Sequence, residues 1–359
     1  MSFMKQVCGL ALAWGALAAG PAAHAADPVD LVGCGSDGRV IAQDAYVRVG
    51  GIEQWVTVRG TDCANPVILF VHGGPGNPMS PFADNIYTPW EGRFTLVQWD
   101  QRGAGRTFAR SPETAEGPLS IERMAEDGVE LAAQMGRRFG QDRIILMGGS
   151  WGSALGVKMA RARPDLFHAY IGSGQLVDYA ANQADTYRRL KGLAQAAGDA
   201  ETVGTLDRMG PPPWADPRAF GAIRRVTRRY EANAATPAPA TWWRATPAYA
   251  TPEAEAAYEA GEDYSYLQFV GLKGDGIYSR LNLLADDLAF EIPVFLVQGE
   301  QDLVTTPAVA ERYFRAIVAP AKAYVLVPHT GHDPNVAMLD AQYAILTERI
   351  LPTIRRAGD

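Results

Sequence analysis

The sequence predicts an α/β fold, in which a mostly parallel sheet is flanked by helices and carries an inserted helical segment. Short continuous apolar runs at 66–71, 94–99 and 143–148 are typical of strands buried on both faces. Helical stretches separate the later strands, and this alternation predicts a parallel sheet. The alternation stops over 178–288 and returns at Pro293, which indicates an insertion rather than an independent helical domain.

The first predicted element is a β-hairpin. Its strands cover 46–49 and 55–58, and Gly50 and Gly51 supply the turn. The three apolar strands follow. The remaining elements are expected as helices over 120–140, 153–164 and 335–351 and as strands over 168–174, 293–299 and 321–327.

We divide the chain into four segments. Residues 1–25 are predicted to be a signal peptide, 26–177 the first part of the core, 178–288 a helical cap and 289–359 the second part of the core. The cap is expected to lie over the carboxyl ends of the strands, where folds of this class bind their ligands.

The composition is that of an ordinary globular protein, with 47% hydrophobic and 20% charged residues. The chain carries 33 Lys and Arg against 40 Asp and Glu, a formal net charge of -7, which argues against nucleic acid as a partner. No H-E-x-x-H or C-x-x-C motif occurs. We therefore expect no metal site. A cofactor is not expected either, because GCGSDG at 33–38 fits G-x-G-x-x-G without a strand before it or a helix after it.

The N-terminus has the features of a secretory signal. Lys5 gives a basic start, an apolar stretch follows over 7–20, and Ala23–Ala25 forms a small-residue cleavage site. A retained membrane anchor is the less favoured alternative, because the apolar stretch is short for a membrane span. We expect cleavage after Ala25, a secreted or periplasmic protein, and no membrane contact once the signal is removed.

Residues 148–153, GGSWGS, carry the main chemical motif. The first five fit G-x-S-x-G, with an apolar strand before the motif and a helix after it. In that context the serine lies on a strained turn and exposes its hydroxyl above the sheet, and its neighbours must be small. Ser150 is therefore a candidate nucleophile. The alternative is a turn that only joins strand to helix.

A serine hydroxyl needs a base, and the base needs an acid that orients it. His332, in the loop after the last strand, is the favoured base, with His329 as the alternative. Asp302 is the favoured acid because it lies further into the loop after strand 293–299, and Glu300 is the fallback. The order serine, acid, histidine is the one expected with this motif.

Charge that develops on a carbonyl oxygen needs preorganised N–H donors. The Trp151 N–H lies at the positive end of the helix that follows Ser150. In the loop HGGPGNP at 72–78, Gly73 or Gly74 lets the backbone approach a substrate closely. We expect these amides to form an oxyanion hole; a flexible turn is the alternative for the glycine loop.

Three motifs together resemble one known family. HGGPG at 72–76, WDQRGAGRT at 99–107 and GGSWGS at 148–153 look, in this order and spacing, like the proline iminopeptidase (prolyl aminopeptidase) family of α/β-hydrolases. The resemblance covers about 40–175 and 290–355.

The resemblance implies the α/β-hydrolase fold, with Ser150, Asp302 and His332 as a catalytic triad. It implies an exopeptidase that removes an N-terminal proline or a similar residue. It also implies that carboxylates of the cap hold the free ammonium group of the substrate. The candidates are Glu262 and Asp263 beside Tyr264, with Glu259 as a further option. Solvated surface carboxylates are the alternative.

The expected function is that of a serine hydrolase, an aminopeptidase that releases N-terminal proline or a similar residue from peptides through an acyl-enzyme. The expected partner is a small peptide or a small-molecule acyl substrate. An esterase or amidase of small molecules with the same triad is the runner-up, and a non-catalytic binding protein on this scaffold is the third possibility. An epoxide hydrolase is disfavoured, because that chemistry uses a carboxylate where Ser150 stands.

The predicted signal peptide has a consequence for the cysteines. Cleavage after Ala25 leaves two cysteines, Cys34 and Cys63, and an even number of thiols in an exported chain predicts one disulfide. Mass spectrometry of the exported protein should find Ala26 at the N-terminus, and titration of the unfolded, non-reduced protein should find no free thiol. Two free thiols would reject the disulfide, and retention of residues 1–25 would reject the signal peptide.

Overall fold

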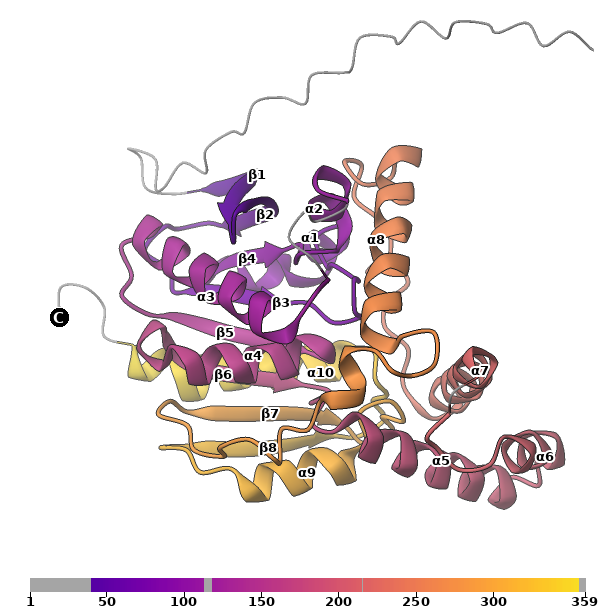
Figure 1. Ribbon diagram of the computed structural model, residues 1–359. Coiled ribbons are helices and arrows are strands. Elements are labelled where there is room, and N and C mark those ends of the chain that lie inside the picture. Colours follow the sequence, from indigo (N-terminus) through magenta and orange to yellow (C-terminus); the bar gives the residue numbers. More distant parts are fainter. Residues whose placement is uncertain (1–39, 113–117, 215, 355–359) are drawn as a thin grey trace, which may run out of the picture.

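A single sheet of eight strands runs through the molecule in the order β1-β2-β4-β3-β5-β6-β7-β8 (Figure 1). Strand β2 pairs antiparallel with β1 and β4, and every other neighbouring pair is parallel. The predicted mostly parallel sheet is thus confirmed. The strands are β1 Ile41–Val49, β2 Ile52–Gly60, β3 Val67–Val71, β4 Thr95–Trp99, β5 Ile144–Gly149, β6 Phe167–Ser173, β7 Val294–Gly299 and β8 Lys322–Val327.

This computed structural model describes residues 40–112, 118–214 and 216–354. The predicted signal peptide and Cys34 lie outside the described residues. Cys63 is buried and disulfide-bonded. Its pairing with Cys34 stays a prediction.

The N-terminal hairpin forms as expected but is longer than the sequence pattern indicates. Val49 pairs with Ile52, so Gly50 and Gly51 are the two turn residues. Their φ angles of 57° and 82° lie in the left-handed region, which glycine adopts without steric cost.

Helices cover both faces of the sheet (Figure 1). Helices α3, α4 and α9 pack on one face, and α1 and α10 pack on the other. Their bounds are α1 Ala83–Tyr87, α2 Gly105–Arg110, α3 Ile121–Arg138, α4 Trp151–Ala162, α5 Tyr179–Ala196, α6 Ala200–Met209, α7 Pro217–Ala234, α8 Pro252–Val270, α9 Pro307–Ala316 and α10 Val336–Ala344. Short 3-10 segments cover Thr88–Trp90, Pro164–Leu166, Ile277–Arg280 and Leu351–Thr353, and a π-helical turn covers Ile345–Ile350.

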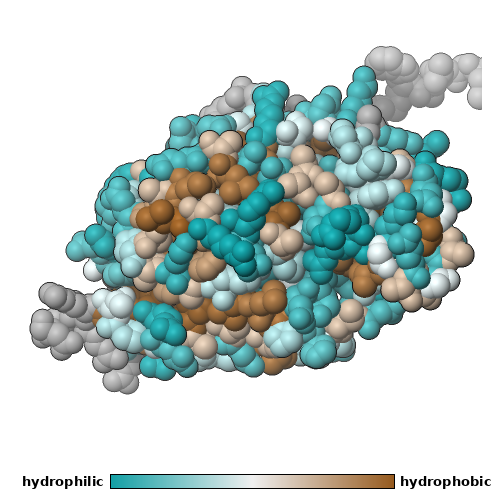
Figure 2. All heavy atoms as spheres, turned by 90° about the horizontal axis from the view of Figure 1, so that it is seen from below, coloured by the Kyte–Doolittle hydropathy of each residue, from teal (hydrophilic) through white to brown (hydrophobic). Residues whose placement is uncertain are grey.

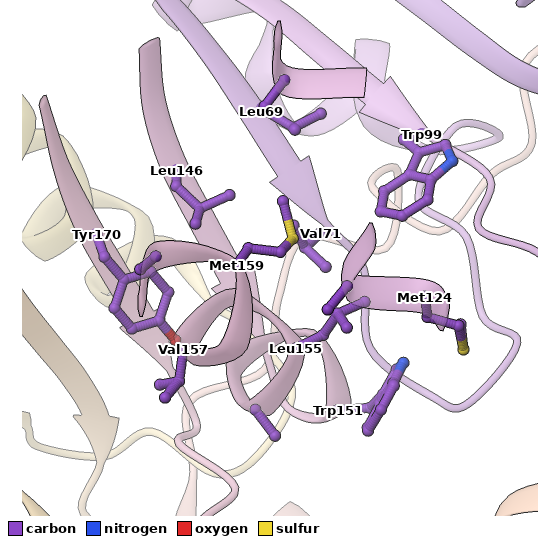
Figure 3. Packing of buried hydrophobic residues seen from close by; sticks show 14 of the residues in the cluster. Leu69, Val71, Trp99, Met124, Leu146, Trp151, Leu155, Val157, Met159 and Tyr170 are labelled. Atoms are coloured by element: carbon purple, nitrogen blue, oxygen red, sulfur yellow. The ribbon is translucent and has the colours of Figure 1, made fainter. Parts of the chain in front are cut away.

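The core explains why the strand sequences read as continuous apolar runs. In β5, Ile144 and Leu146 point to the α3–α4 side, whereas Ile145 and Met147 point to the α10 side. Because both faces are covered, both sets of side chains are buried. Figure 3 shows the α4 side of this core, where Leu155 and Met159 face the strands.

Four helices, α5 to α8, are inserted between β6 and β7. They lie in the interval 178–288 that the sequence analysis assigns to a cap. Figure 1 shows α5, α6 and α7 beyond the ends of the strands and α8 beside α2. The Ser265 hydroxyl on α8 donates a hydrogen bond to the Gly103 carbonyl at 2.7 Å, which ties the cap to the core.

The surface is mixed in character. Seen from below, hydrophobic patches lie among predominantly hydrophilic side chains (Figure 2). Strand β8 is one edge of the sheet, and its Leu326 is exposed. Within the described ranges, none of the helices combines the length and the hydropathy that a membrane span needs.

The packing of α4 on β6 makes a testable prediction. A Cβ at Gly156 would lie 2.6 Å from the ring of Tyr170, which is fully buried and donates a hydrogen bond to the Ser153 carbonyl. Because the ring has no room to move, Gly156→Ala should lower the free energy of unfolding by about 1–3 kcal/mol in denaturant titrations.

A matched control is available on the cap. Gly192 is exposed within α5, and a Cβ added to it would meet nothing within 4 Å. Gly192→Ala should therefore raise the free energy of unfolding by up to about 1 kcal/mol. Equal stability of the Gly156→Ala protein and the unsubstituted protein would contradict this packing.

Candidate active site

Ser150 lies on a sharp turn between β5, which ends at Gly149, and α4, which begins at Trp151. Its φ of 52° and ψ of -120° form a conformation that is costly for a residue with a side chain. The Ser150 N–H donates to the Ser173 carbonyl of β6 at 2.9 Å, which helps to hold the turn. The turn therefore presents the Ser150 side chain at the carboxyl end of the sheet.

The turn also depends on close approach of the backbone at Gly152. A Cβ there would lie 1.9 Å from the Val71 carbonyl oxygen at the end of β3. No side chain fits at that distance, so glycine is required for α4 to start where it does.

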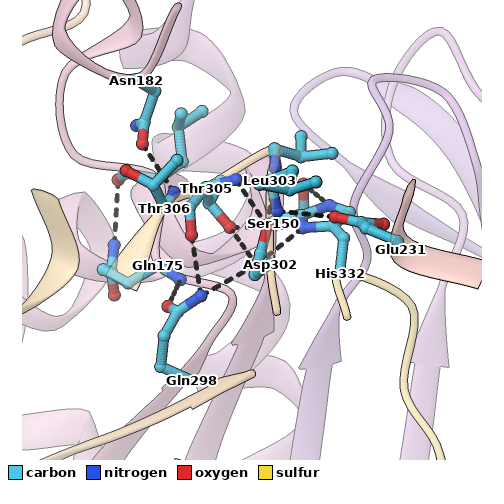
Figure 4. Close-up of polar contacts among 12 residues, drawn as sticks. Ser150, Gln175, Asn182, Glu231, Gln298, Asp302, Leu303, Thr305, Thr306 and His332 are labelled. Carbon is cyan, nitrogen blue, oxygen red and sulfur yellow. Dashed lines mark hydrogen bonds and ion pairs between the residues drawn. The ribbon is translucent and has the colours of Figure 1, made fainter. Parts of the chain in front are cut away.

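The three side chains that the sequence analysis selected lie in contact (Figure 4). His332 Nε2 is 3.0 Å from Ser150 Oγ, and His332 Nδ1 is 3.0 Å from Asp302 Oδ2. The three residues come from the loops after β5, β7 and β8. Both distances are within hydrogen-bond range, which gives a continuous path from carboxylate to hydroxyl.

Asp302 is fully buried and accepts several hydrogen bonds. Its Oδ1 accepts from the N–H groups of Val304 and Thr305, both at 2.8 Å. Its Oδ2 accepts from Gln298 Nε2 at 2.8 Å and from the Thr305 hydroxyl at 2.7 Å. These donors satisfy a buried charge and hold the carboxylate in place beside His332.

The charges of Asp302 and His332 stabilise one another. Burial raises the pKa of Asp302, but His332 and the hydrogen bonds from Thr305 and Val304 outweigh it, so the pKa lies below its usual value. Burial lowers the pKa of His332, but Asp302 and then Glu231 and Asp333 raise it to about 9. The site therefore favours the protonated imidazole, the form in which it holds a proton taken from a hydroxyl.

The alternative acid, Glu300, and the alternative base, His329, do not lie in the site. Glu300 is exposed, and its Oε2 accepts from its neighbour Gln301 at 2.9 Å. His329 is also exposed. Neither side chain is among those that line the central cavity, whereas His332 is.

The glycine loop after β3 packs against the turn at Ser150. A Cβ on Gly73 would lie 3.1 Å from Ser150 Cβ, and both Gly73 and Gly74 line the cavity. Trp151 is the first residue of α4, so its N–H has no acceptor within the helix. The backbones predicted to form an oxyanion hole thus lie on either side of Ser150.

His72 and Gln101 connect this loop to α4. His72 Nδ1 is 2.8 Å from the Gly73 carbonyl, and Nε2 accepts from the Gln101 N–H at 3.1 Å. The Gln101 side chain donates to the His72 carbonyl at 2.9 Å and accepts from Trp151 Nε1 at 3.0 Å. Burial lowers the pKa of His72 to about 4, so its imidazole stays neutral and keeps the Gln101 bond.

Glu231 of α7 is a residue that the sequence analysis missed. Its Oε1 accepts from the Leu303 N–H at 2.6 Å, beside Asp302, and its side chain lines the cavity (Figure 4). Burial raises its pKa to about 7, and the nearby Asp302 adds to the rise. No local motif marks this glutamate, because only the folding of α7 onto the loop after β7 brings it to the site.

The three residues predicted to bind the substrate point in different directions, and only one of them lines the cavity. Glu262 lines the cavity, but Asp263 is exposed and Tyr264 stacks on Phe108 with ring centroids 5.0 Å apart. Asp263 and Tyr264 lie outside the cavity lining, which corrects the prediction for both. Successive residues of a helix point about 100° apart, so only one of three neighbours faces the site. Glu259 is likewise absent from the lining.

The cavity over Ser150 has a volume of about 660 Å³, a size that suits a drug-sized ligand or a short peptide. The sheet side of its wall is rich in apolar side chains, including Phe70, Met79, Phe82, Met147 and Met338. The cap side adds the charged side chains of Arg224, Arg228, Glu231 and Glu262. In the part of the chain that the structure describes, no cluster of three or more His, Cys, Asp or Glu side chains could hold a metal ion.

The chain belongs to the α/β-hydrolase fold family, whose sequence pattern matches residues 66–336. The fold and family place it among hydrolases.

Two relatives of modest sequence identity are named as peptidases. A probable aminopeptidase of Bacillus subtilis, YbaC, is 25% identical over 81% of this chain and 90% of its own length. A probable proline iminopeptidase of Streptomyces coelicolor is 26% identical over 76% of this chain and 84% of its own length. These relatives confirm the resemblance that the three motifs indicated.

Solved structures show the same fold. The proline iminopeptidase of Mycobacterium smegmatis superposes with a TM-score of 0.61 at 19% identity, over 85% of this chain and 97% of that one. The 2-hydroxy-6-oxo-6-phenylhexa-2,4-dienoate hydrolase of a Rhodococcus species superposes with a TM-score of 0.54 at 18% identity, over 86% and 98%.

The coupling of Glu231 to His332 makes a prediction about pH. Glu231→Gln removes a negative charge that raises the pKa of His332, so the pKa should fall. The measurement is an NMR titration of the histidine rings, with His332→Gln used to assign the signal. Glu300→Gln, an exposed change in the same loop as Asp302, serves as the control and should leave the titration in place. An unchanged or higher pKa in Glu231→Gln would contradict the coupling.

Proposed function

We propose that this hydrolase is a serine aminopeptidase that releases N-terminal proline, or a similar residue, from peptides through an acyl-enzyme. The observation that carries the proposal is the contact chain of Ser150, His332 and Asp302, which opens into a cavity with two cap carboxylates. The names of the relatives support the same class of substrate.

In the proposed reaction Ser150 Oγ attacks the carbonyl carbon of the first peptide bond while His332 Nε2 takes its proton. The negative charge on the carbonyl oxygen is stabilised by the N–H of Trp151 and by one from the Gly73–Gly74 loop. His332 then gives its proton to the leaving amine, and the C–N bond breaks. Water, activated by His332, hydrolyses the ester and frees the N-terminal residue and Ser150.

Asp302 supports each proton transfer. It accepts from His332 Nδ1 and thereby turns Nε2 toward the serine hydroxyl. Since His332 acts as a base only when unprotonated, its raised pKa predicts that kcat/KM increases as the pH rises above neutrality. The increase should end where the substrate amine loses the proton that makes it a cation, because α-amino groups have pKa values of about 8.

Two carboxylates can receive a substrate ammonium group. Glu231 lies beside the His332 loop and Glu262 lies on α8, and both line the cavity. The pKa of Glu231, raised by burial, would fall when a cation binds beside it, since opposite charge favours the ionised carboxyl. A free amine would thus be held within reach of the catalytic serine.

An esterase or amidase of small molecules is the second candidate, and the apolar wall around Phe70 and Met147 is the observation that favours it. Such an enzyme needs no ammonium on its substrate. The two candidates therefore differ in what Glu231 does.

The deciding experiment compares proline β-naphthylamide with its N-acetylated form. An aminopeptidase should hydrolyse the free amine with a kcat/KM at least about tenfold higher, because acetylation removes the charge that Glu231 binds. Glu231→Gln should reduce this ratio. Asp263→Asn, an exposed change outside the cavity lining, is the matched control and should keep it.

Equal hydrolysis of the free and acetylated compounds would contradict the aminopeptidase proposal and favour the esterase or amidase. Failure to hydrolyse either compound, with activity on p-nitrophenyl acetate retained, would do the same.

A further inference from the structure

Helix α7 places charges of both signs along the active-site cavity. Glu231, Arg228 and Arg224 recur at spacings of three and four residues and all line the cavity. Residues at these spacings share one face of a helix. A row of charge therefore runs from the triad outward, first negative and then positive.

The two cations are not equally engaged. Arg224 lies 4.0 Å from Glu262, at the outer limit of an ion pair, and about half of its side chain is exposed. Within the described ranges, Arg228 makes no ion pair or hydrogen bond that would hold its guanidinium. Both groups can therefore turn toward an anion in the cavity.

Two other arginines of α7 differ from this pair. Arg225 and Arg229 are not part of the cavity lining. Arg229 is engaged with Asp199 at 2.6 Å and with Thr202, so it joins α7 to α6. Arg224 and Arg228 therefore lie on the face of α7 that lines the cavity, and Arg225 and Arg229 do not.

We propose that Arg228 and Arg224 bind the free C-terminal carboxylate of a short peptide, so that the enzyme is selective for di- and tripeptides. The proposal rests on the proposed aminopeptidase function, because it takes Glu231 as the site of the ammonium group. A guanidinium matches a carboxylate in shape and can donate two parallel hydrogen bonds to it.

The spacing of the charges fits this length of peptide. At 1.5 Å per residue, Arg228 and Arg224 lie about 4.5 Å and about 10.5 Å along the helix axis from Glu231. An extended chain covers about 3.3 Å per residue, so the ends of a di- or tripeptide are separated by about 7–10 Å. The cavity of about 660 Å³ is of a size for such a ligand.

The test compares the tripeptide Pro-Ala-Ala with its C-terminal amide, Pro-Ala-Ala-NH2, which differs in the carboxylate alone. The unsubstituted enzyme should show a kcat/KM about tenfold higher for the free acid. In Arg228→Gln, and more so in the double variant with Arg224→Gln, the acid-to-amide ratio should approach one. Arg225→Gln is the matched control on the same helix and should retain the ratio. Added salt should lower the ratio, because it screens exposed charges.

The outcomes separate this inference from the function on which it rests. A ratio near one in the unsubstituted enzyme, or a ratio that Arg228→Gln and the double variant leave unchanged, overturns the carboxylate site. A preference for proline β-naphthylamide over its N-acetylated form would still support the aminopeptidase function. If the acid-to-amide ratio also fell to about one in Arg225→Gln, the effect would be one of general charge, and the carboxylate site would be overturned as well. No hydrolysis of either peptide or of the arylamide would overturn both proposals.

Discussion

The site depends on one backbone constraint, the left-handed conformation of Ser150 between β5 and α4. The conformation costs free energy, of the order of 1–3 kcal/mol for a residue with a side chain. The surrounding packing holds it: Ser150 donates to β6, and Gly152 lies against the end of β3 without space for a side chain. Because neighbouring parallel strands end at the same edge, the loops that follow β3, β7 and β8 meet the hydroxyl at that point.

The cap does more than cover the site, since it also positions the acid loop. The hydroxyl of Thr186 on α5 donates to the Leu303 carbonyl at 2.7 Å, and Asn182 accepts from the Thr306 N–H at 2.9 Å. From the other side, Glu231 on α7 accepts from the Leu303 N–H. The loop that carries Asp302 is thus held between two cap helices.

The parts of the fold and site that depend on local sequence could be predicted. The apolar runs, the Gly50–Gly51 turn and the G-x-S-x-G motif each specify their own conformation within a few residues, and all appear where expected. Asp302 and Glu300 lie two residues apart, and depth in the loop was enough to favour the aspartate that is buried.

What could not be predicted depends on how distant elements pack. Glu231 reaches the site only because α7 lies against the loop after β7, and its sequence surroundings are those of an ordinary surface helix. For Glu262, Asp263 and Tyr264 the segment was identified but the helical face was not. That face is set by contacts with α2, where Gly261 and Ser265 meet the 103–105 backbone.

The proposed chemistry depends on activation of the Ser150 hydroxyl by His332. Labelling of the folded protein with a fluorophosphonate, followed by peptide mapping, tests it directly, because the reagent reacts with an activated serine. One adduct is expected, on Ser150; it should be lost in His332→Gln and kept in Ser279→Ala, a change at an exposed serine that is not part of the cavity lining. An adduct on another residue, or no adduct on a protein shown to be folded, would contradict it.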